Sequence, residues 1–394
     1  MKVTTDIYLL AAKRTPIASF GSELASLTAT DLASEAIKAT LESAGVSGQE
    51  IEETFLGNVC TAGVGQAPAR QAALKAGISE KSPATTINKV CASGLKSIIL
   101  AAQTLQLNQR KLVVAGGTES MSNIPYYDRA ARWGVKFGDQ KLIDGLAFDG
   151  LTDATERVAM GVLAESVCKE KRIDREAQDQ YSAQSYRRAQ KAWKENAFMN
   201  EICPVKIVTR NEVVTIDKDE ECFRVNFDKI PQLKPVFEAG GTITAASAST
   251  LNDGASAVLL ANSEGLETIS SKPIAKIIGY SETALSPPQF TLAPIEATRA
   301  LLKTTGILLE EIDLFEINEA FAMVPLAFAE ALDVELDKIN IHGGAVSLGH
   351  PIGCSGTRIV VTLVHALKTY NKRYGIAAIC NGGGGASAIL IEAL

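Results

Sequence analysis

The chain has 394 residues, of which 46% are hydrophobic and 21% charged, a composition that predicts a globular protein with a sizeable core. Its 39 basic and 45 acidic residues give a net charge of −6, so no general attraction to nucleic acid is expected. No apolar run approaches the roughly 18 residues of a membrane span, and the N-terminus shows no signal-peptide cleavage pattern. We predict a cytoplasmic protein without nucleic-acid or membrane partners, or a mitochondrial-matrix protein if a presequence has been removed.

The first third of the chain alternates helices with short apolar strands. Strands are predicted at Ile7–Ala12, Glu53–Val59 and Leu112–Ala115, and helices at Asp31–Ala44 and Ala67–Ala76. Such alternation is typical of an α/β fold whose parallel or mixed sheet is covered on both faces.

The middle of the chain has a different pattern. Ile124–Leu151 has no clean period and is expected to form a long excursion, whereas Arg172–Phe198 is a highly charged helix with an expected solvated face. Lys206–Arg224 alternates like an edge hairpin. The turn-rich Gly240–Gly254 then leads back to the first unit through a strand at Ala257–Leu260.

The last third repeats the layout of the first. Helix-ending glycines align at Gly45 and Gly306, and VCASGLKSIILAAQTL aligns with GCSGTRIVVTLVHAL, which places Cys91 against Cys354. The offset stays between 261 and 265 residues throughout, so chance is a poor explanation. We predict two copies of one α/β unit and a site between them that draws on equivalent turns.

Seven cysteines, at positions 60, 91, 168, 203, 222, 354 and 380, form no CxxC pair. Their odd number and irregular spacing argue against a disulfide framework or a zinc module. Cys91 differs from the others because NKVCASGLK has the pattern of a strand end, a tight turn and the first turn of a helix. Unpaired N–H groups and the helix dipole favour a thiolate there, so Cys91 is the candidate nucleophile.

Two C-terminal stretches and one strand end hold candidate partners. His350, in GHPIG ahead of a helix starting near Gly353, could activate the thiol to form an acyl-thioester. Cys380 follows the strand Gly375–Ile379 and precedes four glycines, whose N–H groups suit an oxyanion hole; we expect Cys380 to carry protons. Asn318 ends an apolar strand, where a doubly wound sheet places ligand-binding groups. Walker A, GxGxxG and GxSxG motifs are absent, so nothing indicates ATP, NAD or a serine hydrolase.

Four motifs together resemble those of the thiolase family, and the resemblance covers essentially the full chain. They are Cys91 in NKVCASG, Asn318 in NEAF, His350 in GGAVSLGHPIGCSG and Cys380 in CNGGGGAS. Stretches such as SNIPYYD and ASTLNDGA are most similar to its acetoacetyl-CoA thiolases, the acetyl-CoA C-acetyltransferases. The resemblance implies reversible condensation of two acetyl-CoA to acetoacetyl-CoA and CoA through an acetyl-Cys91 intermediate. Acetyl-CoA, acetoacetyl-CoA and CoA would be the ligands, and no cofactor or metal is implied.

The resemblance also implies an architecture, layered α-β-α-β-α. Two duplicated α/β half-domains would span residues 1–120 plus 248–271 and residues 272–394. An inserted loop domain, residues 121–247, would bind CoA. The resemblance also implies a homotetramer, with tetramer contacts expected from Ile124–Lys141.

In the implied mechanism, His350 activates Cys91, and Cys380 removes the α-proton of the second acetyl-CoA. His350 and a water held by Asn318 would stabilise the enolate, and the N–H groups of Cys91 and Gly382 the tetrahedral intermediate. Further positions match family contacts to CoA or substrate, although ordinary core packing is an equal alternative for most of the apolar ones: Arg224, Ser249, Leu151, Met160, Phe237, Phe321 and Phe290.

Three positions depart from the family's patterns. Many bacterial relatives have His-Met where this chain has Ala159-Met160, so one polar contact to pantetheine is missing. Potassium-activated members have tyrosine where this chain has Cys222, so the sequence does not decide whether a potassium site is present. Members that cleave 2-methylacetoacetyl-CoA have Phe-Pro where this chain has Phe290-Thr291, so activity on branched substrates is open as well.

Three other functions compete with this prediction. A ketoacyl synthase shares the fold and nucleophile but uses a second histidine where this chain has Asn318, and Cys380 offers a base instead. A degradative 3-ketoacyl-CoA thiolase of broader chain length is the nearer rival. A non-catalytic acyl-CoA-binding relative is expected to lose catalytic groups, and all four are present.

Overall fold

The computed structural model describes residues 1, 5–208 and 212–394. Its helices are α1 (Ala29–Ala44), α2 (Pro68–Lys75), α3 (Ser93–Gln106), α4 (Met160–Lys171), α5 (Arg175–Lys194), α6 (Ser263–Glu267), α7 (Ala293–Thr305), α8 (Met323–Leu332), α9 (Ala345–Leu348) and α10 (Ile352–Thr369). Its strands are β1 (Ile7–Arg14), β2 (Ala18–Ser19), β3 (Glu53–Gly57), β4 (Ala84–Ile87), β5 (Leu112–Ser120), β6 (Tyr126–Tyr127), β7 (Ile143–Asp144), β8 (Val205–Val208), β9 (Val213–Ile216), β10 (Asn252–Asn262), β11 (Ala275–Ala284), β12 (Leu314–Ile317), β13 (Tyr374–Asn381) and β14 (Gly385–Ala393).

The central sheet follows the internal repeat. Its strand order is β12-β13-β14-β11-β1-β10-β5-β3-β4, so β3, β5, β10 and β1 of the first half mirror β12, β13, β14 and β11 of the second. The halves meet at β1 and β11, which pair over two positions only, Tyr8 with Lys276 and Leu9 with Ala275. The mixed sheet therefore consists of two repeated halves joined by a narrow seam.

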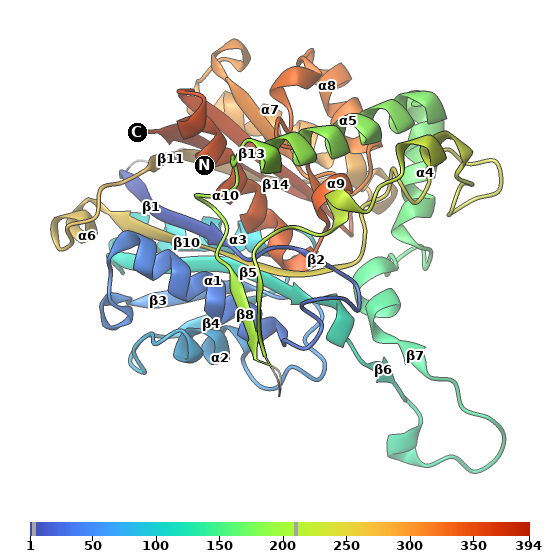
Figure 1. Cartoon of the computed structure of the whole chain (residues 1–394), viewed down its shortest axis with the longest axis horizontal. Helices are drawn as coiled ribbons and strands as arrows, with labels where there is room; N and C mark the ends of the chain where they lie inside the picture. The colour runs from blue at the N-terminus through green and yellow to red at the C-terminus, as the bar shows by residue number, and fades with distance from the viewer. Residues whose placement is uncertain (2–4, 209–211) are drawn as a thin grey trace.

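Helices form three layers around these two half-sheets (Figure 1). The buried helices α3 and α10 lie between the halves, since one apolar cluster combines Ile98 and Leu363 of these helices with Val113 of β5 and Ile389 of β14. Helices α1 and α2 cover the outer face of the first half, and α7 and α8 cover that of the second. The predicted α-β-α-β-α order is confirmed.

The two inner helices cross at glycines. A Cβ atom on Gly94 would lie 2.7 Å from the backbone nitrogen of Thr357, and one on Gly356 would lie 2.3 Å from that of Leu95. The Thr357 hydroxyl donates a hydrogen bond of 2.9 Å to the carbonyl of Gly94. The SG pairs of the CASG and GCSG motifs are therefore explained by backbone contact, which no larger residue permits.

Local signals account for the outer helices. Thr28 and Asp31 form a capping box at the start of α1, and Gly45 ends it with a left-handed φ of 64°. Leu32, Ile37 and Leu41 of α1 are buried against the sheet. In the second half, Gly306 ends α7 in the same way, with a φ of 77°, so the aligned glycines of the repeat have one structural role.

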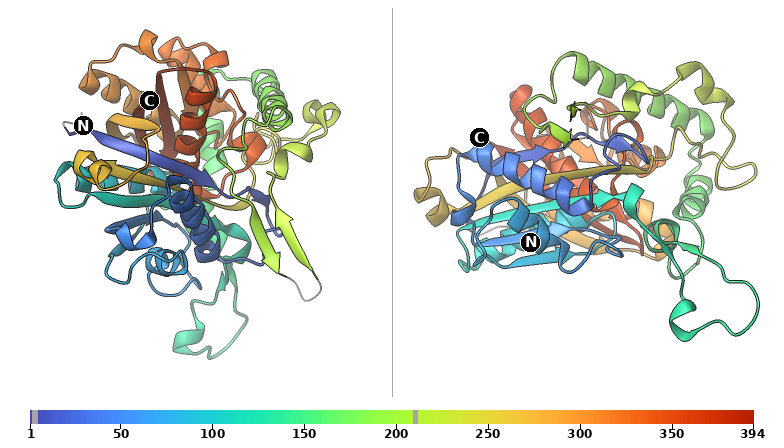
Figure 2. Two further views of the ribbon diagram at one scale, coloured as in Figure 1. Left: turned by 60° about the vertical axis from the view of Figure 1, so that its left-hand side comes forward. Right: turned by 60° about the horizontal axis from the view of Figure 1, so that its bottom comes forward.

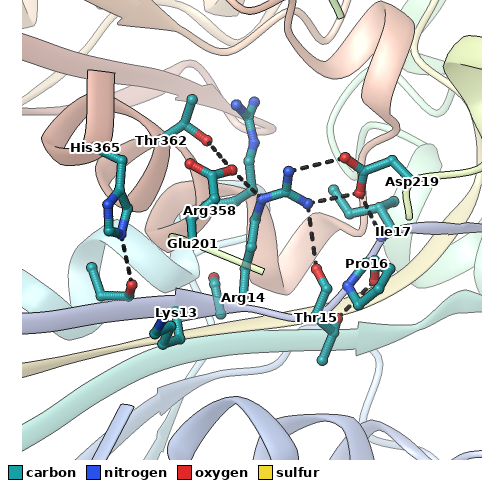
Figure 3. A network of polar contacts seen from close by, with 12 residues as sticks. Lys13, Arg14, Thr15, Pro16, Ile17, Glu201, Asp219, Arg358, Thr362 and His365 are labelled. Carbon is teal, nitrogen blue, oxygen red and sulfur yellow. Dashed lines mark hydrogen bonds and ion pairs between the residues drawn. The ribbon is translucent and has the colours of Figure 1, made fainter. Parts of the chain in front are cut away.

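Glu201 and Asp219, which flank the hairpin β8–β9, are tied to both halves by a buried ion network (Figure 3). Arg14 of β1 pairs with Glu201 at 2.5 Å and forms two hydrogen bonds to Asp219, at 2.7 and 2.9 Å. Thr362 of α10 donates to the same Glu201 oxygen at 3.2 Å. Bidentate Arg–carboxylate pairs are geometrically specific, so this network sets where the inserted region joins the sheet. His365, expected to be structural, bonds the Ala12 carbonyl beside it at 3.0 Å.

Three local predictions need correction or refinement. The strand after α3 does not stop at Ala115 but continues as β5 to Ser120, because Gly116 and Gly117 fit under close backbone neighbours. The hairpin β8–β9 forms a separate two-stranded sheet, not an edge of the main one; its residues 209–211 lie outside the described part. Helix α5 is confirmed as a helix, but its face with Tyr181 and Ser185 is buried.

The excursion after β5 projects away from the layered body (Figures 1 and 2). It holds the short ribbon β6–β7 and exposes large apolar side chains, including Trp133 at 84% and Phe137 at 99%. Among the described helices, none is long and apolar enough to cross a membrane.

Candidate active site

Cys91 lies in the turn between β4 and α3. The turn is strained at Val90, a non-glycine residue with a φ of +48°. Asn88 accepts a hydrogen bond of 3.0 Å from the Val90 N–H, and the Ser93 hydroxyl donates one of 2.6 Å to the Val90 carbonyl. These side chains hold the turn so that Cys91 is only half-buried, unlike the six other cysteines.

The thiol of Cys91 is not activated by its helix. The residue precedes α3 by two positions, so its predicted place in the first helical turn is wrong. Burial raises the pKa of Cys91 to about 11, opposed by the backbone N–H groups of Gly382 and of Cys91 itself. The free protein therefore holds a neutral thiol, and attack requires a base.

His350 is the candidate for that base. Its N–H donates to Asn252 at 2.9 Å, and its Nδ1 lies 2.6 Å from the Ser355 hydroxyl. Ser355 in turn donates to the Pro351 carbonyl at 3.0 Å, so the serine oxygen accepts from Nδ1–H and Nε2 carries the lone pair. Nε2 is buried without a hydrogen-bond partner in the described ranges. Burial, together with the positive charge of Arg358, lowers the pKa of His350 to about 3, so the imidazole is neutral.

Cys380 and Gly382 come from the end of β13. Cys380 is buried, and its pKa is raised far above the usual range by burial and by the neighbouring Cys91. A Cβ atom on Gly382 would lie 3.6 Å from Val90 Cγ1 and 3.7 Å from Met160 Sδ, so Gly382 adjoins the Cys91 turn. The structure brings both cysteines and Gly382 together.

Asn318 directly follows β12. Its N–H donates to the carbonyl of Ala378 at 3.0 Å, so it lies at the same sheet edge as Cys380, two residues further along β13. The side chain is fully buried, yet neither Oδ1 nor Nδ2 has a hydrogen-bond partner within the described structure. Buried polar atoms are nearly always paired, so the free amide, like His350 Nε2, points to a ligand or ordered water.

The predicted apolar contacts gather near these groups. Phe237, Phe321 and Phe290 form a row with ring centroids 5.8 and 6.5 Å apart, although Phe290 and Phe321 are also core residues. Leu151 packs in a small cluster with Cys91. Met160 lies beside Gly382, as described above.

The two polar candidates differ. The N–H of Ser249 donates to the Ala320 carbonyl at 3.0 Å, which places Ser249 next to the NEAF turn. Arg224 has a side chain that is 59% exposed and pairs with Glu220 at 3.1 Å. The structure does not bring Arg224 into contact with the other candidates within its described part. At the position that bears on potassium, Cys222 is fully buried, and the described residues include no group of three or more His, Cys, Asp or Glu that could hold a metal ion.

Sequence patterns missed two buried carboxylates at the site. Glu119 of β5 accepts hydrogen bonds from the Asn58 side chain at 2.7 Å and from the Gly353 N–H at 3.0 Å, which links the first half to the start of α10. Burial raises its pKa to about 7. Glu319 similarly anchors the turn after β12. A charged residue inside or just after an apolar strand was the available signal.

The geometry agrees with what comparison finds. Residues 7–264 match the family described as "Thiolase, N-terminal domain", and residues 271–393 match "Thiolase, C-terminal domain". The chain belongs to the thiolase family. It is 49% identical to a probable acetyl-CoA acetyltransferase of Dictyostelium discoideum, over 99% of this chain and 94% of the relative.

Other relatives differ in compartment. A mitochondrial acetyl-CoA acetyltransferase of Rattus norvegicus is 48% identical over 99% of this chain and 91% of its own length. A cytosolic acetyl-CoA acetyltransferase of Gibberella zeae is 46% identical over 98% of each chain. Thiolases of this similarity therefore occur in both compartments.

Two solved thiolases share the fold over the whole chain. An Ascaris suum thiolase in complex with coenzyme A superposes with a TM-score of 0.93 and 48% identity, covering 99% of this chain and 100% of that one. Human mitochondrial 3-ketoacyl-CoA thiolase gives a TM-score of 0.96 at 37% identity, with full coverage of both. The expected fold class and family are both confirmed.

Proposed function

We propose that this thiolase is an acetyl-CoA C-acetyltransferase, which interconverts two acetyl-CoA with acetoacetyl-CoA and CoA. The observation that carries the proposal is the proximity of two thiols, Cys91 and Cys380, together with an Asn318 at the same sheet edge as Cys380 and buried atoms of Asn318 and His350 that lack partners in the described structure. Acyl transfer followed by α-proton removal needs one nucleophile, one base and donors for two oxyanions. The names of the relatives above support the same activity.

In the first half-reaction, Cys91 attacks the acetyl-CoA carbonyl as His350 Nε2 takes its proton. The N–H groups of Cys91 and Gly382, which face the sulfur, bind the oxygen of the tetrahedral intermediate. The C–S bond to CoA then breaks, and the imidazolium returns its proton to the departing CoA thiolate. The products are acetyl-Cys91 and CoA.

In the second half-reaction, Cys380, acting as its thiolate, removes a methyl proton from another acetyl-CoA. Burial and the neighbouring Cys91 raise the pKa of Cys380, so its thiolate is a strong base, and acetylation of Cys91 removes the second of these two causes. His350 and a water held by Asn318 stabilise the enolate oxygen. The enolate carbon then attacks acetyl-Cys91; Cys91 leaves as a thiolate and recovers the proton from Cys380, which balances the cycle.

We infer that CoA lies along the inserted region, with Leu151, Met160, Phe237 and Ser249 near the pantetheine and Arg224 near the nucleotide. Phe290 would border the acyl pocket. The guanidinium of Arg224 is exposed and bonds Glu220 through Nη1; its other nitrogens can donate to a phosphate, which supports a nucleotide contact at the rim and not at the reacting centre. Neither half-reaction requires a cofactor.

We also propose a homotetramer. The excursion that projects from the body exposes Trp133, Phe137 and Leu142 at 84, 99 and 66%. Such a concentration of large apolar side chains favours contacts between subunits. The compartment is proposed to be cytoplasm or mitochondrial matrix, the two in which the named relatives occur.

A substrate panel tests the proposed activity. Thiolysis of acetoacetyl-CoA is expected to exceed that of longer 3-ketoacyl-CoA esters, since the short-chain relatives share about half of the residues. Adding 2-methylacetoacetyl-CoA and repeating the panel with and without potassium tests the consequences of Thr291 and Cys222. A preference for long chains would favour the degradative thiolase instead.

A further inference from the structure

Glu319, the acidic residue of NEAF, is a fully buried carboxylate held by four neutral donors. Its Oε1 accepts from the Tyr181 hydroxyl at 2.7 Å and from the Asn340 amide at 2.9 Å. Its Oε2 accepts from the Ser185 hydroxyl at 2.8 Å and from the Val346 N–H at 3.0 Å. These four bonds use the acceptor sites of an ionised carboxylate.

On one side, this cluster fixes the turn that carries Asn318. Asn340 accepts a hydrogen bond from the Ile317 N–H and donates one to its carbonyl, both at 2.8 Å. The same amide reaches Glu319. The residues before and after Asn318 are therefore held by one side chain, while the Asn318 amide itself stays unpartnered within the described chain.

On the other side, the cluster reaches the segment that leads to His350. Val346 lies in α9, four residues before His350. Gly344 packs on the carboxylate, because a Cβ atom there would lie 2.4 Å from Glu319 Cδ. Its N–H donates to Ser185 at 3.2 Å, and α5, which carries Ser185, contacts α9 (Figure 1). The NEAF and GGAVSLGHPIG motifs thus meet at Glu319.

His350 has anchors that do not involve Glu319, namely Asn252 at its N–H and Ser355 at Nδ1. In the described structure, Asn318 has one anchor of its own, its backbone bond to Ala378. Disturbing Glu319 therefore shifts the Asn318 turn relative to His350 more than it shifts the imidazole.

We propose that Glu319 is a positioning residue that fixes the separation between the Asn318 amide and His350 Nε2. The inference rests on the proposed function, in which these two groups together stabilise the enolate. Glu319 would act on enolate formation and not on acetylation of Cys91, which depends on His350 and on the N–H groups around the sulfur.

All four hydrogen bonds to Glu319 require an acceptor atom at both side-chain positions. In Glu319→Gln, an amide NH₂ replaces one oxygen and faces two donors. The hydroxyls of Tyr181 and Ser185 can rotate to accept from the new NH₂ group. An NH₂ at the Oε2 position loses the bond from the Val346 N–H, and an NH₂ at the Oε1 position loses the bond from the Asn340 amide, so one of these two bonds is lost in either orientation. Tyr181→Phe is the milder variant, since it removes one donor and keeps the shape of the side chain.

The experiment measures both half-reactions in the full-length protein. Acetylation of Cys91 by acetyl-CoA is followed by mass spectrometry, and enolate formation by exchange of the acetyl-CoA methyl protons in D₂O. We expect Glu319→Gln to slow the exchange by about 10²-fold, the effect of a misplacement of about 1 Å, while acetylation changes by a much smaller factor. Tyr181→Phe is also expected to slow exchange more than acetylation, but by a smaller factor than Glu319→Gln.

Glu201→Gln is the matched control. Glu201 is equally buried, but its Oε2 has no partner in the described part of the molecule, so an amide group fits there while Oε1 keeps Arg14 and Thr362. The melting temperature of the Glu201→Gln variant reports the effect of losing a buried charge on stability. The exchange and acetylation rates of this variant should stay near those of the wild type.

A double-mutant cycle decides whether Glu319 acts through Asn318. In an Asn318→Ala background, Glu319→Gln should add little further loss of exchange, because coupled residues are not additive. The proposal would be overturned if the losses of exchange caused by Glu319→Gln and Asn318→Ala multiply in the double variant. It would also be overturned if Glu319→Gln slows acetylation and exchange equally. If the wild type forms no acetyl adduct on Cys91, the proposed function fails instead, whatever Glu319 does.

Discussion

The two copies of the repeated unit place equivalent cysteines in different environments. Cys91 precedes α3 by two residues and is half-buried in a strained turn. Cys354 is the third residue of α10 and fully buried, with Ser256 Oγ 3.2 Å from its sulfur. Burial raises the pKa of both thiols to about 11. Their intrinsic acidity is therefore alike, and access and partners make one the candidate nucleophile.

This difference follows from where each helix begins. Relative to the repeat, α10 starts earlier than α3 and takes Cys354 into its first turn. The segment before α10 then presents His350 to the site. The first copy supplies the thiol of Cys91 and the second supplies His350 as the candidate base. The proposed acyl transfer therefore needs groups from both copies.

The largest expected effect comes from removing the accessible thiol. Cys91→Ser should lower acetoacetyl-CoA thiolysis by at least ~10³-fold, since an alkoxide forms much less readily than a thiolate. The measurement is steady-state thiolysis of a folded variant. Near-normal turnover would show that Cys91 is not the nucleophile.

Cys380→Ser should separate the two half-reactions. Loss of a general base costs about 10²–10⁴-fold, so condensation should fall by that order, whereas Cys91 should still be acetylated by acetyl-CoA. Mass spectrometry of the variant incubated with acetyl-CoA checks this. Absence of the acetyl adduct would contradict the division of roles between the cysteines.

The pH dependence of Cys91 alkylation tests the neutral Cys–His pair. With the pKa of Cys91 near 11 and that of His350 near 3, the thiolate fraction rises with pH below the thiol pKa. Alkylation by iodoacetamide should therefore increase about tenfold per pH unit from pH 7 to 9. A rate that levels off near neutral pH would reveal a thiolate–imidazolium pair instead.

The smallest effect is expected at the second copy. Cys354→Ser should leave both half-reactions near wild type, because the side chain is buried in α10 and retains a polar neighbour in Ser256. Acetylation and thiolysis are measured against the Cys91→Ser variant. A loss comparable to that variant would mean that the copies do not differ as their environments indicate.

The sequence by itself determined the layers, the family and the set of chemically active side chains. Periodic apolar residues and capping signals are local, so α1 with Thr28 and Gly45 follows from its own residues. The repeat offset predicted that Cys91 and Cys354 occupy equivalent turns. The glycines around His350 and the strand ends at Asn318 and Cys380 brought these three residues under consideration.

Only the tertiary structure decided how these side chains behave. Whether Cys91 is a thiolate depends on burial by distant segments, which outweighs the effect of the N–H groups of Gly382 and Cys91 on its pKa. The tautomer of His350 depends on the turn that joins α9 to α10. The four donors around Glu319 come from other elements, two of them more than a hundred positions away in the sequence, and the free amide of Asn318 is likewise a property of the packed structure. Local sequence patterns specify elements, but desolvation and hydrogen-bond partners arise only when those elements pack.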